Sequence, residues 1–267
     1  MGSAGEAGGG CGGVILMGRL GPFEENTIVV GDCLDIMAQM PDGCVDLVVT
    51  DPPYGYADFG YWSQSKAIEF YEGIGREFGR LMKWGASLYL FPGWMFYCEA
   101  RQVISNHLHY LKTLIWDKRT FTATRGDVAT LTYHNIAEPV ILAYKRGAIL
   151  IFNLEDVRVP TIHNDPRSNP AGKRPGDILS CIAVRNNARE KTSHPTQKPE
   201  KLFTTFIKAS SNPGDLIFDP FIGSGTTAVV ADRLGRKFFG CDISEDYVKM
   251  ALKRLGKDRA ARQLELL

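Results

Sequence analysis

Short apolar runs alternate along the chain with longer segments in which apolar residues recur at helical spacing. The apolar runs predict strands over residues 26–32, 45–51, 87–93, 111–118, 138–147, 215–219 and 237–244. The amphipathic segments predict helices over residues 33–40, 64–84, 94–108, 199–211, 225–235 and 245–256. Because strands and helices alternate, we expect an α/β fold with a doubly wound, mostly parallel sheet. The run VDLVVTD (45–51) is apolar on both faces, as a buried parallel strand is.

Two segments interrupt this pattern. Residues 1–13 are mostly Gly, Ala and Ser, and we interpret residues 1–21 as a flexible leader outside the fold. Between residues 150 and 192, Pro, Asn, Arg and Gly dominate. A stretch of about 40 residues with so little periodicity is too long for an ordinary connection, so this segment is expected to be functional or partly disordered.

The composition is that of an ordinary globular protein. The chain has 267 residues, 44% hydrophobic and 23% charged, and a net charge of +1. This length suits one large α/β domain or one domain with an insertion. The charge is unevenly distributed, because residues 112–191 carry 13 Lys and Arg against 8 Asp and Glu. Such an excess is compatible with a solvated surface and with a segment that faces a polyanion.

Cysteine usage and hydropathy limit the class of protein. The six cysteines are scattered without a CxxC pair or zinc-ligand spacing, so no metal site is predicted. Reduced thiols in a cytoplasmic protein are the natural interpretation. No apolar run approaches the roughly 20 residues that a membrane helix needs.

The predicted strand 45–51 ends in an acid, and two prolines and an aromatic residue follow it. The tetrapeptide is Asp51-Pro52-Pro53-Tyr54. Two consecutive prolines fix two φ angles, remove two backbone donors and push the preceding residues out of the helical region. We therefore expect a stiff, extended turn that presents a carboxylate and a phenol side by side.

A strand, a glycine-rich turn and a helix follow one another in LIFDPFIGSGTTAVVADRLG (216–235). Gly223 and Gly225 allow a tight bend and a close approach of a ligand to the backbone. Asp242, 17 residues after Gly225, ends the next predicted strand, where it can accept hydrogen bonds from ribose hydroxyls. The arrangement predicts a nucleoside-cofactor site, with a purely structural tight turn as the alternative.

The residues around this loop narrow the choice of cofactor. The chain has no Gly-Lys-Ser/Thr triplet of a kinase-type phosphate loop. NAD stays an alternative, but Asp219 at the strand tip would repel a pyrophosphate. A cofactor with a cationic centre and an ammonium group suits an acid there, and S-adenosylmethionine has both.

Four motifs together resemble one family of enzymes. In chain order they are VVGDCLDIM (29–37), DPPY (51–54), TSHPTQKPEKLF (192–203) and FDPFIGSGTT (218–227). Because DPPY precedes the glycine loop, which lies near the C-terminus, the sequence resembles the beta class of amino-group DNA methyltransferases over roughly residues 26–256. The resemblance implies a Rossmann-like fold with permuted motif order and the following division: a catalytic half over 22–118, a target-recognition region over 119–190 and a cofactor half over 191–267.

The resemblance also implies roles for individual residues. Asp51, Pro52, Pro53 and Tyr54 would be catalytic. The cofactor would contact Asp32, Thr196, Lys198, Asp219, Phe221, Gly223, Ser224, Gly225, Thr226 and Asp242. For His194, a structural role is as good an interpretation as a functional one. The candidate nucleic-acid contacts, all within 119–190, are Arg125, Arg167, Lys173 and Arg174.

The implied reaction explains why an acid and a ring stand together. An exocyclic amine is a poor nucleophile, because its lone pair is conjugated into the base. Asp51 and the carbonyl of Pro52 can each accept a hydrogen bond from that amine, which frees the lone pair, and the carboxylate stabilises the charge that develops. Tyr54 offers a face for the base, which must leave the duplex to reach the site.

An acid at the first position of this tetrapeptide favours adenine in the resembling family, so we expect S-adenosylmethionine-dependent methylation of adenine in duplex DNA. The alternatives are the cytosine amino group, RNA, an NAD-dependent oxidoreductase and an inactive DNA-binding module. No Pro-Cys pair for carbon-5 methylation occurs. The sequence leaves open a homodimer and a companion restriction endonuclease.

Overall fold

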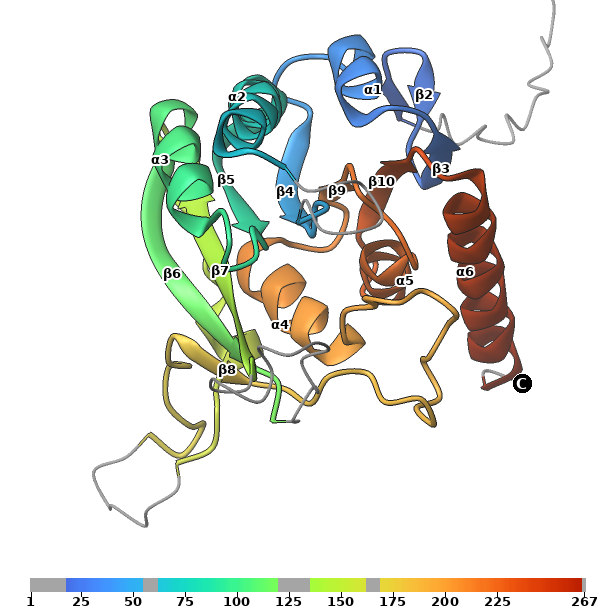
Figure 1. Ribbon diagram of the computed structural model, residues 1–267. Helices are drawn as coiled ribbons and strands as arrows, with labels where there is room; N and C mark the ends of the chain where they lie inside the picture. The colour runs from blue at the N-terminus through green and yellow to red at the C-terminus, as the bar shows by residue number, and fades with distance from the viewer. Residues whose placement is uncertain (1–17, 55–61, 120–134, 162–168, 266–267) are drawn as a thin grey trace, which may run out of the picture.

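The computed structural model describes residues 18–54, 62–119, 135–161 and 169–265. An eight-stranded sheet runs through the molecule (Figure 1). In sheet order its strands are β3 (Thr27–Val30), β10 (Lys237–Asp242), β9 (Leu216–Asp219), β4 (Val45–Thr50), β5 (Met82–Leu90), β7 (Ala137–Tyr144), β6 (His109–Asp117) and β8 (Ile178–Ser180).

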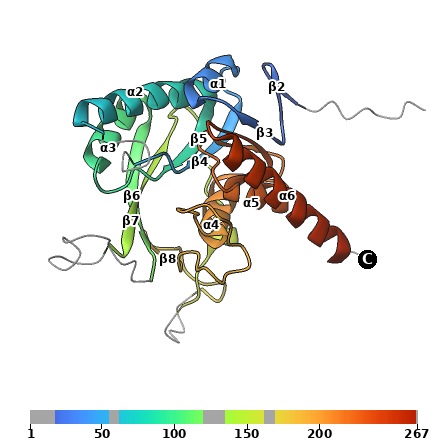
Figure 2. The same cartoon turned by 45° about the vertical axis from the view of Figure 1, so that its right-hand side comes forward.

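Helices cover both faces of this sheet, as Figures 1 and 2 show. One core lies between the sheet and helices α1 (Cys33–Gln39), α2 (Gln64–Leu81) and α3 (Tyr97–His107). A second core lies between the opposite face and helices α4 (Glu200–Ser210), α5 (Thr226–Arg233) and α6 (Glu245–Glu265). Strands buried on both faces explain the continuous apolar runs in the sequence.

The strand directions decide which residues meet at the site. The strands from β3 through β10, β9 and β4 to β5 are parallel, whereas β7 is antiparallel to both of its neighbours and β8 is parallel to β6. The predicted α/β fold with a mostly parallel, doubly wound sheet is confirmed. Because β7 runs in the opposite direction, its first residues lie at the edge where the parallel strands end.

One predicted boundary is wrong by several residues. The helix expected over 64–84 ends at Leu81, and β5 begins at once with Met82. Met82 has an extended backbone (φ −70°, ψ 140°) and pairs with Val45 of β4. The apolar pair Leu81-Met82 continues the apolar stripe of the helix, and no Gly or Pro separates the two elements, so the spacing could not reveal the junction.

Two further predictions are corrected at the ends of the fold. The helix expected to stop at Gly256 continues to Glu265. Beyond that glycine, Arg259 and Arg262 bind Asp232 of α5, which holds the added turns against the domain. Near the N-terminus, the leader was expected to reach residue 21, but Leu20 is buried and lies in β1 (Arg19–Leu20), which pairs with β2 (Phe23–Glu24).

The irregular segment has some structure of its own. Besides β8 it contains the short helix η3 (Leu154–Val157). None of the helices in the described part of the chain is both long and apolar enough to span a membrane.

Candidate active site

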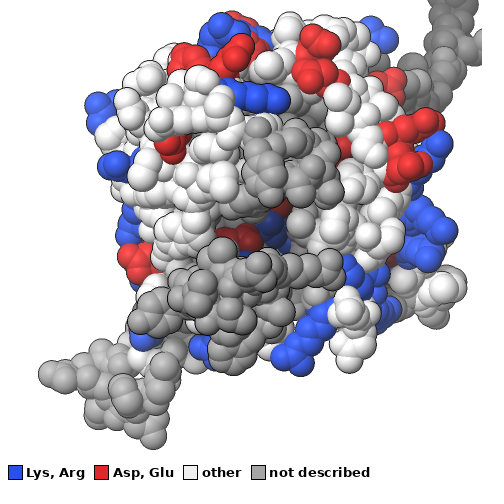
Figure 3. Space-filling model, in the orientation of Figure 1, with Lys and Arg blue, Asp and Glu red and all other residues white. Residues whose placement is uncertain are grey.

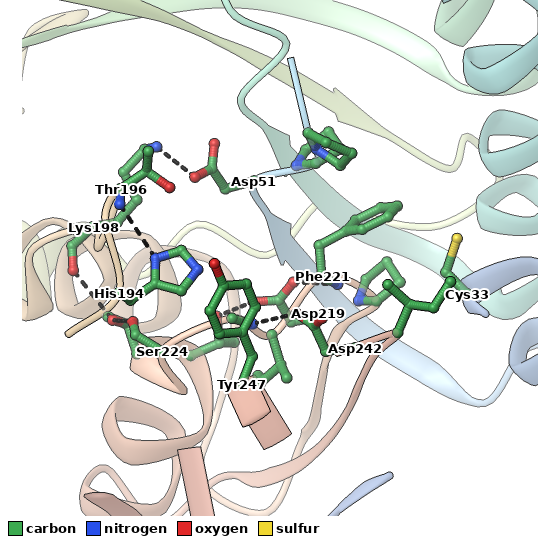
Figure 4. A pocket seen from close by; sticks show the side chains of 18 of the residues that line it. Cys33, Asp51, His194, Thr196, Lys198, Asp219, Phe221, Ser224, Asp242 and Tyr247 are labelled. Carbon is green, nitrogen blue, oxygen red and sulfur yellow. Dashed lines mark hydrogen bonds and ion pairs between the residues drawn. The ribbon is translucent and has the colours of Figure 1, made fainter. Parts of the chain in front are cut away.

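A cavity of about 480 Å³ opens where the carboxyl ends of the parallel strands meet (Figure 4). Asp51 follows β4, Asp219 ends β9 and Asp242 ends β10, and all three line the cavity. In open α/β sheets, ligands bind outside the carboxyl ends of the strands. The fold thus brings together motifs that are far apart in the sequence.

The glycine loop between β9 and α5 forms the floor of this cavity. Gly223 and Gly225 have φ angles of +47° and +78°, a conformation that other residues rarely adopt. The backbone N–H of Gly223 donates to Oδ2 of Asp242 at 3.0 Å, and the N–H of Ser244 donates to Oδ1 at 2.9 Å. The Asp242 carboxylate therefore fixes the loop to the end of β10.

Asp219 is a buried carboxyl that joins β9 to its surroundings. It accepts hydrogen bonds from the hydroxyls of Thr50 at 2.7 Å and Thr227 at 2.5 Å, and from the N–H of Phe221 at 3.1 Å. Burial raises the pKa of Asp219 to about 7, although these hydrogen bonds favour the charged form. This carboxyl holds the glycine loop against β4.

Asp51 lies on the opposite wall, with both of its oxygens engaged. Oδ1 accepts a hydrogen bond from the hydroxyl of Tyr54 at 2.6 Å, and Oδ2 accepts one from Nζ of Lys198 at 2.5 Å. The ring of Tyr54 lies against Gly93, where an added Cβ would come within 3.0 Å of it. Burial raises the pKa of Asp51, against the opposing effect of the Lys198 ammonium.

Two charged residues behind Asp51 are not among the site residues predicted from the sequence. Oε1 of Glu138 forms an ion pair with Nζ of Lys118 at 2.7 Å, and its Oε2 lies 3.5 Å from Nζ of Lys198. Lys118 directly follows β6, Glu138 is the second residue of β7, and these strands are antiparallel neighbours. The sequence places a lysine at the end of one apolar strand and an acid near the start of the next. This pattern indicates an ion pair only if the two strands are known to be neighbours.

His194 and two phenylalanines complete the cavity wall. Nδ1 of His194 accepts a hydrogen bond from the N–H of Thr196 at 3.3 Å, and burial lowers the pKa of the ring to about 4. The neutral imidazole therefore carries its proton on Nε2, which faces Gly223. The rings of Phe70 and Phe221 lie 5.8 Å apart on another side of the cavity.

Comparison with known proteins identifies the family. A sequence model of N6_N4_Mtase, described as DNA methylase, matches residues 45–253. The chain belongs to the N6/N4 DNA methylase family. The DNA adenine methyltransferase YhdJ of Escherichia coli is 33% identical to it over 87% of this chain and 83% of YhdJ. The type II methyltransferase M1.MboII of Moraxella bovis is also 33% identical, over 86% of this chain and 96% of its own length.

Solved structures agree with this assignment. The M1.HpyAVI–SAM complex has a TM-score of 0.63 and 25% identity, covering 86% of this chain and 98% of that protein. The cytosine-N4-specific PvuII DNA methyltransferase shares the fold, with a TM-score of 0.69 and 18% identity over 85% of each chain. This member of the family is an S-adenosylmethionine-dependent DNA methyltransferase.

The cavity of the methyltransferase fits that cofactor. Its volume lies in the range of small-molecule sites. Carboxyl groups of Asp32 and Asp242 line it, which suits a positively charged cofactor that carries ribose hydroxyls. Phe70 and Phe221 provide an apolar surface for a purine ring.

Most of the predicted site residues of the methyltransferase line this one cavity. The four residues of the DPPY tetrapeptide do so, together with Asp32, Thr196, Lys198, Asp219, Phe221, Gly223, Ser224, Thr226 and Asp242. Gly225 does not, because it packs against Ala251 of α6. Lys198 directs its ammonium at Asp51, so its predicted contact with the cofactor stays a prediction.

Two of the candidate DNA contacts, Lys173 and Arg174, do not line the cavity. Lys173 and Arg174 are exposed, and the Arg174 guanidinium lies 5.1 Å from the ring of Phe152. Arg125 and Arg167 fall outside the described residues. Figure 3 shows the face of the methyltransferase that carries a hollow, with Lys and Arg side chains gathered at its lower right.

Proposed function

We propose that this methyltransferase modifies the 6-amino group of adenine in duplex DNA. The observation that carries the proposal is the Asp51 carboxylate, held at the cavity wall by Tyr54 and followed by two prolines. In the resembling family, an acid at this position favours adenine. A relative with 33% identity is named a DNA adenine methyltransferase, which supports the same choice.

The chain's own residues account for activation of the amine. Asp51 and the carbonyl of Pro52 accept hydrogen bonds from the two N–H groups, which frees the nitrogen lone pair for attack. Because both acceptors follow a buried strand and precede a fixed proline, little motion is needed to align them. The bound cofactor supplies an electrophilic methyl group on its sulfonium. As positive charge builds on the nitrogen, the Asp51 carboxylate stabilises it.

The base reaches Asp51 only after it leaves the helical stack, at a cost of a few kcal/mol. The ring of Tyr54 is a candidate surface for the flipped base. Exposed cations of the 119–190 segment, among them Lys173 and Arg174, are proposed to hold the DNA backbone meanwhile.

Nucleoside mass spectrometry tests the proposal. Plasmid DNA from a host without DNA methylation is incubated with the protein and isotope-labelled S-adenosylmethionine, then digested to nucleosides. We expect the label in 6-methyladenine. Label in 4-methylcytosine would show that the target base is cytosine and not adenine. Label found only in added RNA would show that duplex DNA is not the substrate. Asp51→Ala should abolish transfer while cofactor binding, followed by calorimetry, is retained.

A further inference from the structure

A buried row of four alternating charges leads away from the cavity. The row consists of Lys118, Glu138, Lys198 and Asp51, with side chains that are 9%, 13%, 6% and 17% exposed. Successive charged atoms are separated by 2.7, 3.5 and 2.5 Å. Two positive and two negative charges compensate one another, which makes so much buried charge tolerable.

The position of Lys198 in this row interferes with the proposed binding of the target amine by Asp51. The ammonium of Lys198 occupies the carboxylate oxygen Oδ2. An amine that becomes positively charged at the same carboxylate would be repelled by that ammonium. Lys198 is buried in the cavity wall, and its Nζ lies 5.3, 5.3 and 5.9 Å from the ring centres of Tyr54, Phe91 and Trp116. Among the described residues, the second carboxylate that pairs with this ammonium is that of Glu138.

We propose that Glu138 is a positioning residue that takes over the Lys198 ammonium when the target amine reaches Asp51. The proposal rests on the proposed function, the transfer of a methyl group to that amine, and deepens it. Lys198 keeps its proton and moves from Oδ2 of Asp51 toward Oε2 of Glu138, which is 3.5 Å away. Lys118 holds the other oxygen, Oε1, so that Oε2 faces Lys198. The aromatic rings keep the cation in a favourable environment throughout the shift.

The charge of Glu138 is suited to this role. Burial favours its neutral form, but Lys198 and Lys118 outweigh burial and lower its pKa, so Glu138 is present as a carboxylate. The cation remains charged as well, because Asp51 and Glu138 outweigh the effect of burial and raise the pKa of Lys198.

Glu138→Gln tests the proposal, because it keeps the shape of the side chain and removes its charge. With unmethylated plasmid DNA and tritiated S-adenosylmethionine, kcat should fall about tenfold or more. The cofactor Kd, measured by calorimetry, should stay close to that of the wild type. Glu138→Asp should restore part of the rate. The matched control is Glu77→Gln, which removes an equally buried carboxylate, 14% exposed, from its 2.7 Å ion pair with Arg80 and should leave kcat unchanged.

The pH dependence separates this role from a merely structural one. The charged and titratable groups that face Asp51 are Lys198, Tyr54, Glu138 and Asp219. Since the negative charge of Glu138 raises the pKa of Asp51, its removal should shift the acid limb of the kcat profile to lower pH. A wild-type kcat, or a reduced kcat with an unshifted acid limb, would overturn the proposal. A wild-type protein that labels no DNA would instead overturn the proposed function.

Discussion

At Asp219, burial and hydrogen bonding have opposite effects on the pKa of the carboxyl group. Burial wins and raises the pKa to about 7, despite donors at Thr50, Thr227 and Phe221. The folded protein therefore binds this proton more tightly than the unfolded chain, whose aspartates titrate near 3.9. The free energy of unfolding should fall as the pH rises from about 4 to about 7, and this contribution should be constant above that range.

Asp219→Asn should remove this part of the pH dependence, because an amide does not titrate. Relative to the wild type, the variant should become more stable as the pH rises, by at most ~1.4 kcal/mol per pH unit. Urea unfolding of both proteins at pH 5 and pH 7 measures the difference. The same difference in stability at both pH values would contradict the assignment.

Asp242 has a structural role, because each of its oxygens accepts a hydrogen bond from a backbone N–H, and it is also predicted to bind the ribose of the cofactor. If its remaining lone pairs hold the ribose, Asp242→Ala should weaken S-adenosylmethionine binding by ~1.5–3 kcal/mol, the range for hydrogen bonds to a charged group. Calorimetry measures this, with Asp246→Ala as a control, because Asp246 is exposed and does not line the cavity. Unchanged affinity in Asp242→Ala would mean that other residues hold the ribose.

Among the elements, the contact between α5 and α6 depends on Gly225. It combines a φ of +78° with a position where an added Cβ would lie 2.8 Å from Cβ of Ala251 and 2.9 Å from its Cα. Gly235 has a similar φ, +72°, but open space around it. The two glycines therefore separate backbone strain from steric conflict.

Gly235→Ala should lower the free energy of unfolding by ~1–2 kcal/mol, the cost of a left-handed backbone for alanine. Gly225→Ala should cost a further ~1–3 kcal/mol, because the neighbouring helix has to shift. Urea denaturation of both variants gives the comparison. Equal losses would show that α6 accommodates the methyl group freely.

The elements predicted from the sequence are those with their own local signals. The strand–loop–helix around Gly223 and the buried strand before Asp51 lie where the pattern predicts them. The end of α2 differs from the prediction, because the apolar pair Leu81-Met82 suits a helix and a strand equally, and which of the two forms depends on the partner it packs against. Local spacing carries no information about that partner.

The same limit applies to the candidate site. DPPY and the glycine loop were found because their chemistry is contiguous in sequence. Glu138 and Lys118 were not, because each is an ordinary charged residue at a strand end, and only the antiparallel pairing of β6 with β7 brings them together beside Lys198.

For the whole molecule, DNA binding should depend on cations away from the cavity. Replacing Lys173 and Arg174 together by alanine should weaken DNA binding and reduce the slope of log K against log salt by up to ~0.9 per lost phosphate contact. Fluorescence anisotropy over a salt series measures both quantities. The paired control replaces Arg76 of α2 and Lys83 at the start of β5, which are both exposed. An unchanged slope in Lys173→Ala/Arg174→Ala would place the DNA elsewhere.

The order of strands in the sheet also governs how the chain acquires its structure. β3 and β4 are close in sequence, yet β10 and β9, from the carboxyl-terminal part, lie between them. During synthesis the facing edges of β3 and β4 therefore emerge long before their partners, and unpaired strand edges promote association with other chains. Contacts between such distant segments also slow folding. We therefore expect the cofactor cavity to close late in folding, and the nascent chain to be most prone to aggregation until β9 and β10 have been made.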